Sequence, residues 1–366
     1  MIAALRRSGV DVIECHESLW HGIEDRVQAA SGGWLRPAFL WRVLGTYARL
    51  LRRYSRIGQY DVLVVGYPGQ LDVFLARALN WLNRKPLVWD VFMSIYLIAI
   101  ERGLAARSRM TASLLRQVER IACRLPDVLV IDTEDYAAWF NRTHDVPLQR
   151  FRLVPTGADE RIFRPIAEPR LSPNALRVLY YGTFIPNHGV CTIVEAARLL
   201  TGDPAIRFEL IGDGPDKTKA MTLARDYALQ NVVFSDWLDP PILVSRIAQS
   251  DICLGVFGTT PQSLMTVQNK IYEGLAMAKP VVSGDSPAVR SVLRHGEHIF
   301  LCRREDPPAL AEAIQVLHHD PVLRQGLSEN GRRIFVEQFA IEPLGQRYRA
   351  HLEQILETCR GGAETV

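Results

Sequence analysis

The stretch Asn269–Leu293, NKIYEGLAMAKPVVSGDSPAVRSVL, joins a helix pattern, a strand pattern and a second helix start in direct succession. Ile271, Leu275 and Ala278 recur at positions i, i+4 and i+7, which places them on one apolar helix face. The apolar run Pro280–Ser283 follows at once, and a proline then opens the next helix. Helix, strand and helix in this order are typical of a parallel α/β domain.

The same alternation continues on both sides of this stretch. The strands predicted in the second half are Arg177–Gly182, Arg207–Gly212, Asn231–Phe234, Ile252–Phe257, Pro280–Ser283 and Phe300–Cys302. Those predicted in the first half are Val10–Cys15, Asp61–Gly66, Pro86–Val91, Asp127–Asp132 and Phe151–Pro155. These runs lack strict polar–apolar alternation, which indicates strands buried on both faces of parallel sheets.

Helical patterns connect the predicted strands, as right-handed crossovers in a parallel sheet require. In the first half they are Trp34–Arg56, Leu71–Leu82, Thr111–Arg124 and Glu134–Asn141. In the second half they are Gly189–Leu200, Pro215–Leu229, Pro241–Ser250, Gln268–Met277, Pro287–Arg294 and Pro308–His318.

A polar segment with three prolines, Arg164–Pro173, separates the two series and is typical of a linker. The sequence therefore predicts an N-terminal Rossmann-like domain over residues 1–165, a C-terminal Rossmann-like domain over 174–338 and a terminal segment over 339–366. The first domain lacks the strand and Gly-rich loop with which a doubly wound domain usually begins. Either the protein begins further upstream or this domain has an unusual edge.

The composition excludes several classes of protein. With 48% hydrophobic and 23% charged residues, the chain of 366 residues is ordinary for a globular protein, and a net charge of +3 does not favour a nucleic-acid binder. The six cysteines form no C-x-x-C pair, so neither a zinc site nor a disulfide framework is predicted. No apolar run reaches about 18 residues, and the N-terminus is charged too early for a signal peptide. We expect a cytoplasmic protein.

Asn269, Lys270 and Glu273 are the first candidate site residues. A carboxylate such as Glu273, near a strand end, can accept hydrogen bonds from both hydroxyls of a ribose. Lys270 lies at the helix start, where its charge and the helix N-terminus can together meet a phosphate. The alternative is a surface helix whose lysine and glutamate are merely solvated.

Two other strand–loop–helix joints carry candidate residues. Ile211–Asp216, IGDGPD, supplies glycines and a helix N-terminus that favours an anion, with Lys217 and Lys219 close behind. Tyr180–Val190, YYGTFIPNHGV, places Thr183, Asn187 and His188 on a loop at a strand end, where His188 could donate to a phosphate. The alternatives are an ordinary strand–helix turn, exposed lysines and a histidine without a catalytic role.

Asp90 interrupts the apolar run of LVWDVFMSIY, Leu87–Tyr96. A buried lone carboxylate costs several kcal/mol unless it is paired, so its presence needs a reason. It either binds a sugar hydroxyl or caps a nearby loop or helix.

The second half contains five motifs in order: YYG-loop-HG, RFELIGDGP, NVVFSDWL, SDICLGVFG and the stretch from Asn269. On these motifs it resembles glycosyltransferase family 4, which contains retaining enzymes of the GT-B fold. The resemblance covers most of residues 177–320 and extends more loosely to WDVFMSIY, VLVIDTEDYAAWF and FRLVPTGADERIFRP. It implies two facing Rossmann-like domains with a cleft between them, an acceptor-side N-domain and a donor-binding C-domain. It also implies that the C-terminal helix Glu342–Glu357 crosses back to the N-domain.

Carried over residue by residue, the resemblance assigns the donor site. Glu273 would bind the donor ribose, and Trp237 and Leu238 would flank the nucleobase. The remaining assignments are glycines: Gly182 and Gly189 bound the loop that meets the diphosphate, and Gly212 and Gly214 lie on the neighbouring turn.

Four positions depart from the family pattern. Met265 stands where the first glutamate of the Glu-seven-residue-Glu motif would fall. Thr183 and His188 replace the phosphate-binding arginine and lysine, and Trp89 replaces the histidine that faces the donor sugar, beside Asp90. We expect Lys270 to supply the missing phosphate charge.

The implied activity is transfer of a sugar from a nucleotide-sugar to a glycan or lipid-linked acceptor, with retention of anomeric configuration, in bacterial-type polysaccharide or glycolipid synthesis. Asp90 and His188 are the candidate catalytic residues of this hexosyltransferase-type enzyme. No Asp-x-Asp motif is evident, so no essential metal and no cofactor beyond the nucleotide-sugar are predicted. The rival hypotheses are a non-catalytic GT-B subunit that binds a nucleotide or a partner protein, and a nucleotide-sugar epimerase.

The segment from Trp34, WLRPAFLWRVLGTYARLLRRYSR, mixes large apolar residues with arginines. The arginines are Arg36, Arg42, Arg49, Arg52, Arg53 and Arg56. Such a basic amphipathic helix can lie on an anionic membrane face, which predicts peripheral contact with the inner membrane. The alternative is an ordinary domain helix with arginines on its solvent face.

Overall fold

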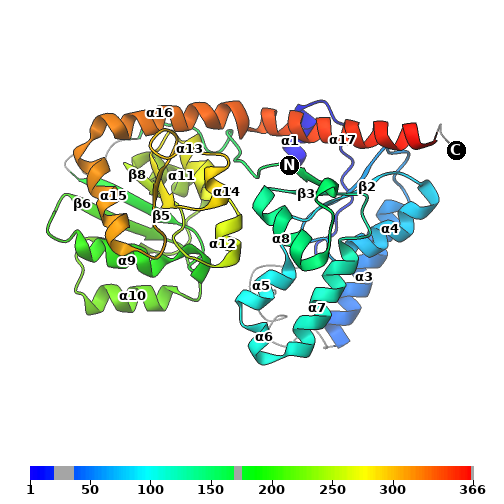
Figure 1. Ribbon diagram of the computed structural model, residues 1–366, viewed down its shortest axis with the longest axis horizontal. Coiled ribbons are helices and arrows are strands. Elements are labelled where there is room, and N and C mark those ends of the chain that lie inside the picture. The colour runs from blue at the N-terminus through cyan, green and yellow to red at the C-terminus, as the bar shows by residue number, and fades with distance from the viewer. Residues whose placement is uncertain (20–36, 169–174, 364–366) are drawn as a thin grey trace.

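The computed structural model describes residues 1–19, 37–168 and 175–363 and shows two lobes, each built on one parallel sheet (Figure 1). The N-lobe sheet has the order β1-β2-β3-β4, with β1 Leu63–Val65, β2 Leu87–Asp90, β3 Val128–Ile131 and β4 Phe151–Leu153. The C-lobe sheet has the order β10-β9-β8-β5-β6-β7. Its strands are β5 Leu176–Tyr181, β6 Ile206–Ile211, β7 Val232–Ser235, β8 Ile252–Leu254, β9 Val281–Gly284 and β10 Phe300–Cys302.

Helices cover both sheets. Those of the N-lobe are α1 Ile2–Arg7, α3 Pro37–Tyr54, α4 Asp72–Asn83, α5 Ile95–Glu101, α6 Leu104–Arg107, α7 Arg109–Ala122 and α8 Glu134–His144. Those of the C-lobe are α9 Val190–Leu199, α10 Lys217–Asp226, α11 Pro240–Gln249, α12 Pro261–Met265, α13 Asn269–Ala276, α14 Pro287–Arg290, α15 Pro307–His319 and α16 Pro321–Gln338. The final helix is α17 Ile341–Ala363.

The C-lobe core consists of two apolar layers, one on each face of the sheet. Along β5, Val178 and Tyr180 join the layer under α9, α10 and α15, whereas Leu179 and Tyr181 join the layer under α11, α13 and α14. This follows from the two-residue repeat of a strand, which sends alternate side chains to opposite faces. Both faces are therefore buried, as the continuous apolar runs predicted.

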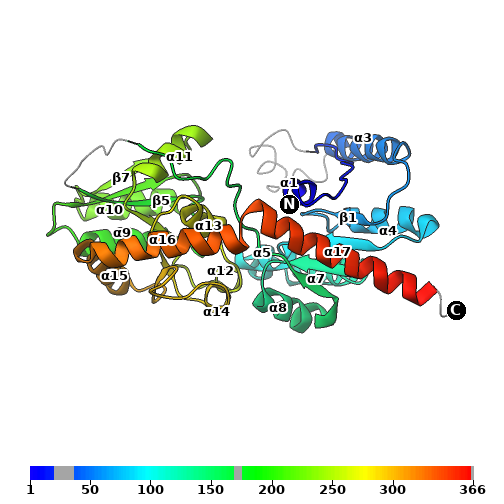
Figure 2. The ribbon, with the colours of Figure 1, turned by 90° about the horizontal axis from the view of Figure 1, so that it is seen from above.

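The helices α16 and α17 run along both lobes on one side of the molecule (Figures 1 and 2). Tyr348, Leu352 and Ile355 of α17 pack with Val88 and Val130 of the N-lobe sheet. The last helix therefore ties the C-lobe to the N-lobe through an apolar contact.

The prediction of a strand at Val10–Cys15 is wrong. The segment joins no sheet, and its Val10 and Val12, like Val62, pack against the core beneath α17 instead. Among the described residues, no strand pairs with the outer edge of β1, which is only three residues long. Without a neighbouring strand, the segment is held by this packing and by hydrogen bonds to α1: the Val10 N–H donates to the Leu5 carbonyl, and Arg6 donates to the Val12 carbonyl.

The predicted helices are present with shifted ends, and the described residues contain four further helices that were not predicted. Three of them, α5, α6 and α12, are too short for a periodic pattern to be recognised, and α16 buries only Leu327, Gly331 and Phe335. Two predicted segments lie partly outside the described residues. They are the Trp34–Arg56 helix before Pro37, including Arg36, and the linker Arg164–Pro173 from Pro169 onward.

The basic helix α3 has an exposed apolar side. Trp41 and Leu44 are 73% and 60% exposed, and Arg49 and Arg53 both pair with Glu17. Within the described ranges, no helix combines the length and the apolar character needed to cross a bilayer.

Candidate functional site

The predicted donor residues come together where the C-lobe strands end. Because all six strands are parallel, the loops after β5 and β6 lie on the same edge of the sheet. The loop after β5 contains the short 3₁₀ helix Pro186–His188, and α13 follows nearby with Lys270 on its first turn. This edge faces the N-lobe, since the Asn187 side chain hydrogen-bonds to Glu101 of α5.

Lys270 and His188 form the centre of the site. The buried Lys270 ammonium lies 4.2 Å above the centroid of the Tyr180 ring and 3.4 Å from Nδ1 of His188. Nδ1 lies 2.5 Å from the carbonyl oxygen of Thr183, so this nitrogen donates and carries a proton. The Tyr180 hydroxyl also donates to that carbonyl, at 2.9 Å. His188 is thereby fixed with Nε2 as its other polar atom.

Because Gly182 has no side chain, the Lys270 ammonium can lie directly against its backbone. A Cβ atom at position 182 would lie 2.6 Å from Nζ of Lys270, and the residue has a φ of +142°, which favours glycine. A Cβ at Gly212 would lie 2.0 Å from the Gly182 carbonyl oxygen. The predicted glycines therefore allow the two strand ends to approach each other and the lysine to reach the loop.

The electrostatics of this centre favour an anionic ligand. Burial lowers the pKa of Lys270 to about 7, against the opposing influence of Glu273. Burial, and then the neighbouring Lys270 charge, hold the pKa of His188 well below its usual range. An anion placed between these groups would favour their protonated forms, because an opposite charge raises the pKa of a cation.

Glu273 lies one turn after Lys270 on α13 and is half-buried. Burial raises the pKa of its carboxyl, and the Tyr181 hydroxyl and Lys270 act in the opposite direction. Asn269 begins the helix and is exposed. A carboxylate so placed can accept hydroxyl hydrogen bonds from a ribose whose phosphates meet Lys270.

The other predicted donor residues differ in how accessible they are. Trp237, in the loop after β7, is 52% exposed, whereas Leu238 packs on the C-lobe core. Lys217 is paired with Asp236. Lys219 is exposed on α10. Trp237 thus offers an exposed aromatic face, and Lys217 is oriented toward the same loop by its ion pair with Asp236.

Two carboxylates stand at the end of the N-lobe sheet. Burial raises the pKa of Asp90, at the end of β2, to about 6. Asp132, just after β3, is 7% exposed, and neither of its oxygens has a side-chain hydrogen-bond partner. Burial, with a smaller contribution from Asp90, raises the pKa of Asp132 to about 7. Asp90 is predicted from the sequence and Asp132 is not, although the position of Asp132 at a strand end was an available signal.

Two of the departures from the family pattern are buried. Trp89 is fully buried in the N-lobe core. Met265 is 8% exposed and packs with the same N-lobe cluster, and its carbonyl accepts a hydrogen bond from Thr133. Met265 therefore forms part of the contact between the lobes.

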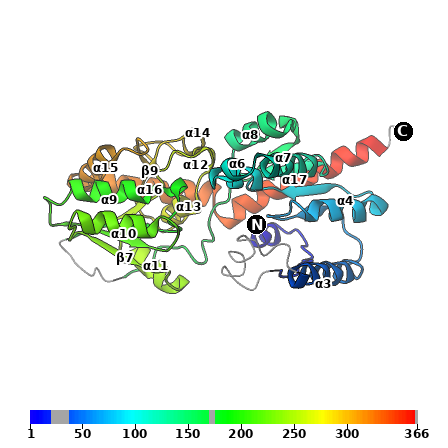
Figure 3. The same ribbon diagram turned by 90° about the horizontal axis from the view of Figure 1, so that it is seen from below.

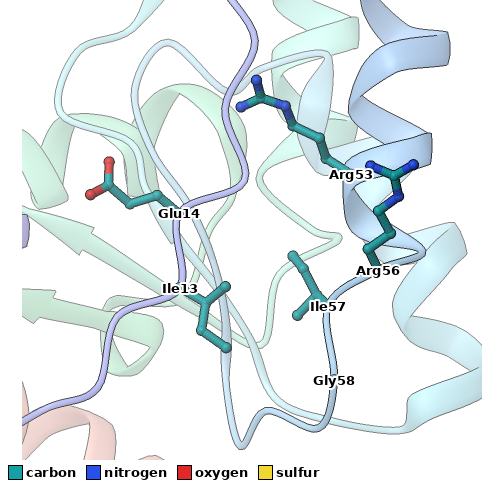
Figure 4. Close-up of a pocket in the computed structure, with 6 residues that line it drawn as sticks. All are labelled: Ile13, Glu14, Arg53, Arg56, Ile57 and Gly58. Carbon is teal, nitrogen blue, oxygen red and sulfur yellow. The ribbon is translucent and has the colours of Figure 1, made fainter.

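A surface pocket in the N-lobe lies away from this centre. It has a volume of about 370 Å³ and lies beside the end of α3 (Figure 4). It is lined by Ile13, Glu14, Arg53, Arg56, Ile57 and Gly58, none of which is a predicted donor-site residue. The donor residues are therefore brought together by the strand ends of the C-lobe and not by this pocket.

Comparisons with known proteins identify chains of similar sequence. Residues 175–320 match the family model described as glycosyl transferases group 1. The alpha-D-kanosaminyltransferase of Streptomyces kanamyceticus is 23% identical over 326 residues, 86% of this chain and 81% of that protein.

Solved structures resemble the whole architecture. Sucrose-phosphate synthase from Thermosynechococcus elongatus has a TM-score of 0.70 at 20% identity, covering 88% of this chain and 79% of that one. HepE of Anabaena in complex with UDP has a TM-score of 0.66 at 15% identity, covering 84% and 81%. The predicted GT-B fold is confirmed.

Proposed function

We propose a donor and a reaction for this chain, whose residues 175–320 match the glycosyl transferases group 1 model and which has the GT-B fold. It transfers a hexose-type sugar from a nucleotide-sugar to a glycan or lipid-linked acceptor, with retention, in polysaccharide or glycolipid synthesis. The observation that carries the proposal is the Lys270–His188 pair behind Gly182, with Glu273 one turn away. Membership of family 4 is part of the same proposal.

The donor would lie along the C-lobe strand ends. Its diphosphate meets Lys270, His188 and the loop from Gly182 to Gly189, its ribose meets Glu273, and its base lies against Trp237. Cations and loop N–H groups are suited to the charge of a diphosphate. HepE, which has a similar fold, was solved with UDP, and this supports UDP as the first probe.

The reaction needs a leaving diphosphate to be stabilised as the sugar bond breaks. Lys270 and His188 would gain protons on donor binding and oppose the charge that develops on the leaving oxygen. Asp90 would accept a hydrogen bond from the acceptor hydroxyl on the N-lobe side. This set of groups needs no metal ion and no cofactor beyond the co-substrate.

The acceptor side of the proposal includes a membrane surface. Trp41 and Leu44 are exposed on α3, and Arg52 and Arg56 are exposed toward its end. A helix of this kind binds anionic lipid through apolar insertion and charge. Sedimentation with vesicles tests it: equal binding to anionic and to neutral vesicles would contradict the proposal.

The donor proposal is tested by thermal shift with a panel of nucleotide-sugars and UDP. A ligand that binds only the folded state raises the unfolding midpoint, so the true donor should give a clear shift. K270A should abolish that shift, and K85A, a change of an exposed lysine in the N-lobe, should leave it unchanged. Loss of the shift in both variants, or in neither, would argue against the site.

A non-catalytic GT-B subunit is the second candidate function. Trp89 and Met265 favour it, because both are buried where the family pattern places polar groups that meet the donor sugar. Release of UDP from the bound nucleotide-sugar distinguishes the two: turnover by wild-type protein supports the enzyme, and binding without turnover supports the subunit.

A further inference from the structure

Glu101 connects the two lobes through both of its carboxylate oxygens. It is the last residue of α5 in the N-lobe. Its Oε2 accepts a hydrogen bond from the Asn187 side-chain amide at 3.1 Å, and its Oε1 accepts one from the backbone N–H of Gln262 at 2.9 Å. Both donors belong to the C-lobe. The helix α5 lies beside α12 (Figures 1 and 2), and α8 of the N-lobe also contacts α12, as the view from below shows (Figure 3). One carboxylate therefore joins the lobes at two points.

Asn187 is also held from within the C-lobe. The Ser263 hydroxyl donates to the Asn187 carbonyl oxygen at 2.7 Å. Arg304 donates to the Ser263 hydroxyl at 2.8 Å and to the Gly258 carbonyl at 2.7 Å. A Cβ atom at Gly258 would lie 2.2 Å from the carbonyl of Pro186, so the loop backbone is in close contact with its support. Asn187 is thus fixed by both lobes.

The N-lobe end of this connection is rigid. Glu119 accepts hydrogen bonds from the Ser94 hydroxyl at 2.5 Å and from the backbone N–H of Ile95 at 2.7 Å, so the start of α5 is fastened to the N-lobe core. Glu119 is 1% exposed. Glu101 therefore moves with the N-lobe as a unit.

The donor loop lies next to this contact. Asn187 precedes His188, whose Nδ1 faces the Lys270 ammonium at 3.4 Å. A change in the position of Asn187 must shift His188, because one peptide bond joins them. The distance between the lobes and the shape of the candidate diphosphate site are therefore mechanically linked.

We infer that Glu101 is a positioning residue that couples closure of the two lobes to the shape of the donor loop through Asn187. The inference rests on the proposed function for the nature of the ligand. The contact between the lobes can be tested without any ligand.

An exchange of hydrogen-bonding roles tests the inference. In E101Q the amide oxygen can still accept from Gln262, and the Asn187 amide can turn so that its oxygen accepts from the new NH2 group, so this variant removes the charge and keeps both hydrogen bonds. In N187D two carboxylates face each other. In the double variant E101Q/N187D, the amide introduced on α5 can donate to the carboxylate introduced in the loop, while its oxygen still accepts from Gln262. The changes are nearly isosteric, which keeps the variants close to the native shape.

UDP affinity by calorimetry and the radius of gyration by solution scattering are the two readouts. We expect N187D to bind UDP roughly tenfold more weakly and to be more open, because it loses the hydrogen bond and places two carboxylates opposite each other, whereas E101Q should stay within about threefold of wild type. The double variant should return to within about threefold of wild type, because it restores both hydrogen bonds without a charge repulsion. E312Q, a change of an exposed glutamate on α15, is the control and should match wild type.

Two results would overturn the inference: an N187D variant that behaves as wild type, or a double variant no better than N187D. Failure of wild-type protein to bind UDP would instead count against the proposed donor. The scattering comparison would still decide whether Glu101 holds the lobes together.

Discussion

Nζ of Lys270 lies 3.4 Å from Nδ1 of His188, so two groups that become cations face each other across the candidate donor loop. Two like charges at this distance disfavour each other, and burial disfavours both. The pair is therefore poised to gain charge when an anion arrives. This relationship joins residues 82 positions apart in the chain.

UDP affinity should depend on pH through Lys270. In the unliganded protein, burial lowers the pKa of Lys270 to about 7. A bound diphosphate would raise this pKa, so above about pH 7 UDP binding is coupled to protonation of Lys270. The dissociation constant should rise up to about tenfold per pH unit between about pH 7 and pH 9, a range in which the phosphate itself is already ionised. Calorimetry across this range measures it, and K270M should bind weakly with little pH dependence. A flat wild-type profile would contradict the role of Lys270.

Gly182→Ala should damage donor binding directly. The added methyl would lie 2.6 Å from Nζ of Lys270 on a backbone with a φ of +142°. We expect UDP affinity to fall at least about tenfold and the unfolding midpoint to drop. Gly202→Ala is the matched control, because a Cβ there meets nothing within 4 Å. Unchanged UDP binding by the Gly182 variant would show that the lysine does not need this space.

Trp237→Ala should weaken UDP binding without destabilising the fold. The indole is 52% exposed and offers a face for a base, and stacking of a base on an aromatic ring contributes roughly 1–3 kcal/mol. Trp81→Ala, at an N-lobe tryptophan that is 80% exposed, should leave UDP affinity unchanged. Quenching of tryptophan fluorescence by UDP gives an independent reading. Equal affinities in both variants would remove Trp237 from the site.

Asp132→Asn should stabilise the protein at high pH. Burial raises the folded pKa of Asp132 from an ordinary 3.8 to about 7, so the fold favours its protonated form. The contribution of Asp132 to the free energy of unfolding is therefore fully present below about pH 3.8 and is lost as the pH rises from 3.8 to about 7. Asn at this position removes the charge, and we expect a gain of roughly 1 kcal/mol or more at about pH 8 that shrinks at about pH 5. Thermal denaturation at both pH values measures it.

Asp226→Asn, a change of an exposed carboxylate, is the control for that experiment and should show no such pH dependence. A decrease in the midpoint of the Asp132 variant at high pH would mean that the carboxylate has a stabilising partner.

Much of the fold could be predicted because burial on both faces of a sheet leaves continuous apolar runs in the chain. The runs at Val128–Ile131 and Ile252–Leu254 are strands with every residue buried. Val10–Cys15 has the same local character but is not a strand, since pairing depends on a neighbouring strand and not on the segment alone. The short helix α5 also lacked a pattern long enough to detect.

The site was predictable in part. Lys270, Glu273 and the glycines after β5 and β6 were selected as separate motifs, and the structure places Lys270 against Gly182 and His188. Glu101 and Asp132 were not selected, because a single carboxylate has no local signature that distinguishes a buried contact from a solvated one. Met265 was identified as a departure, but its contact with the N-lobe could not be read from the chain.

The sequence by itself determined the parallel α/β architecture, the order of the donor motifs and the helix carrying Lys270 and Glu273, since these depend on local periodicity and spacing. Only the tertiary structure decided which polar groups are buried, which cations face each other and how Glu101 links Asn187 to the N-lobe. These properties arise from contacts between segments far apart in the chain. Charge states and hydrogen-bond partners depend on the residues that surround a group in the folded protein, and a local sequence pattern does not specify those residues.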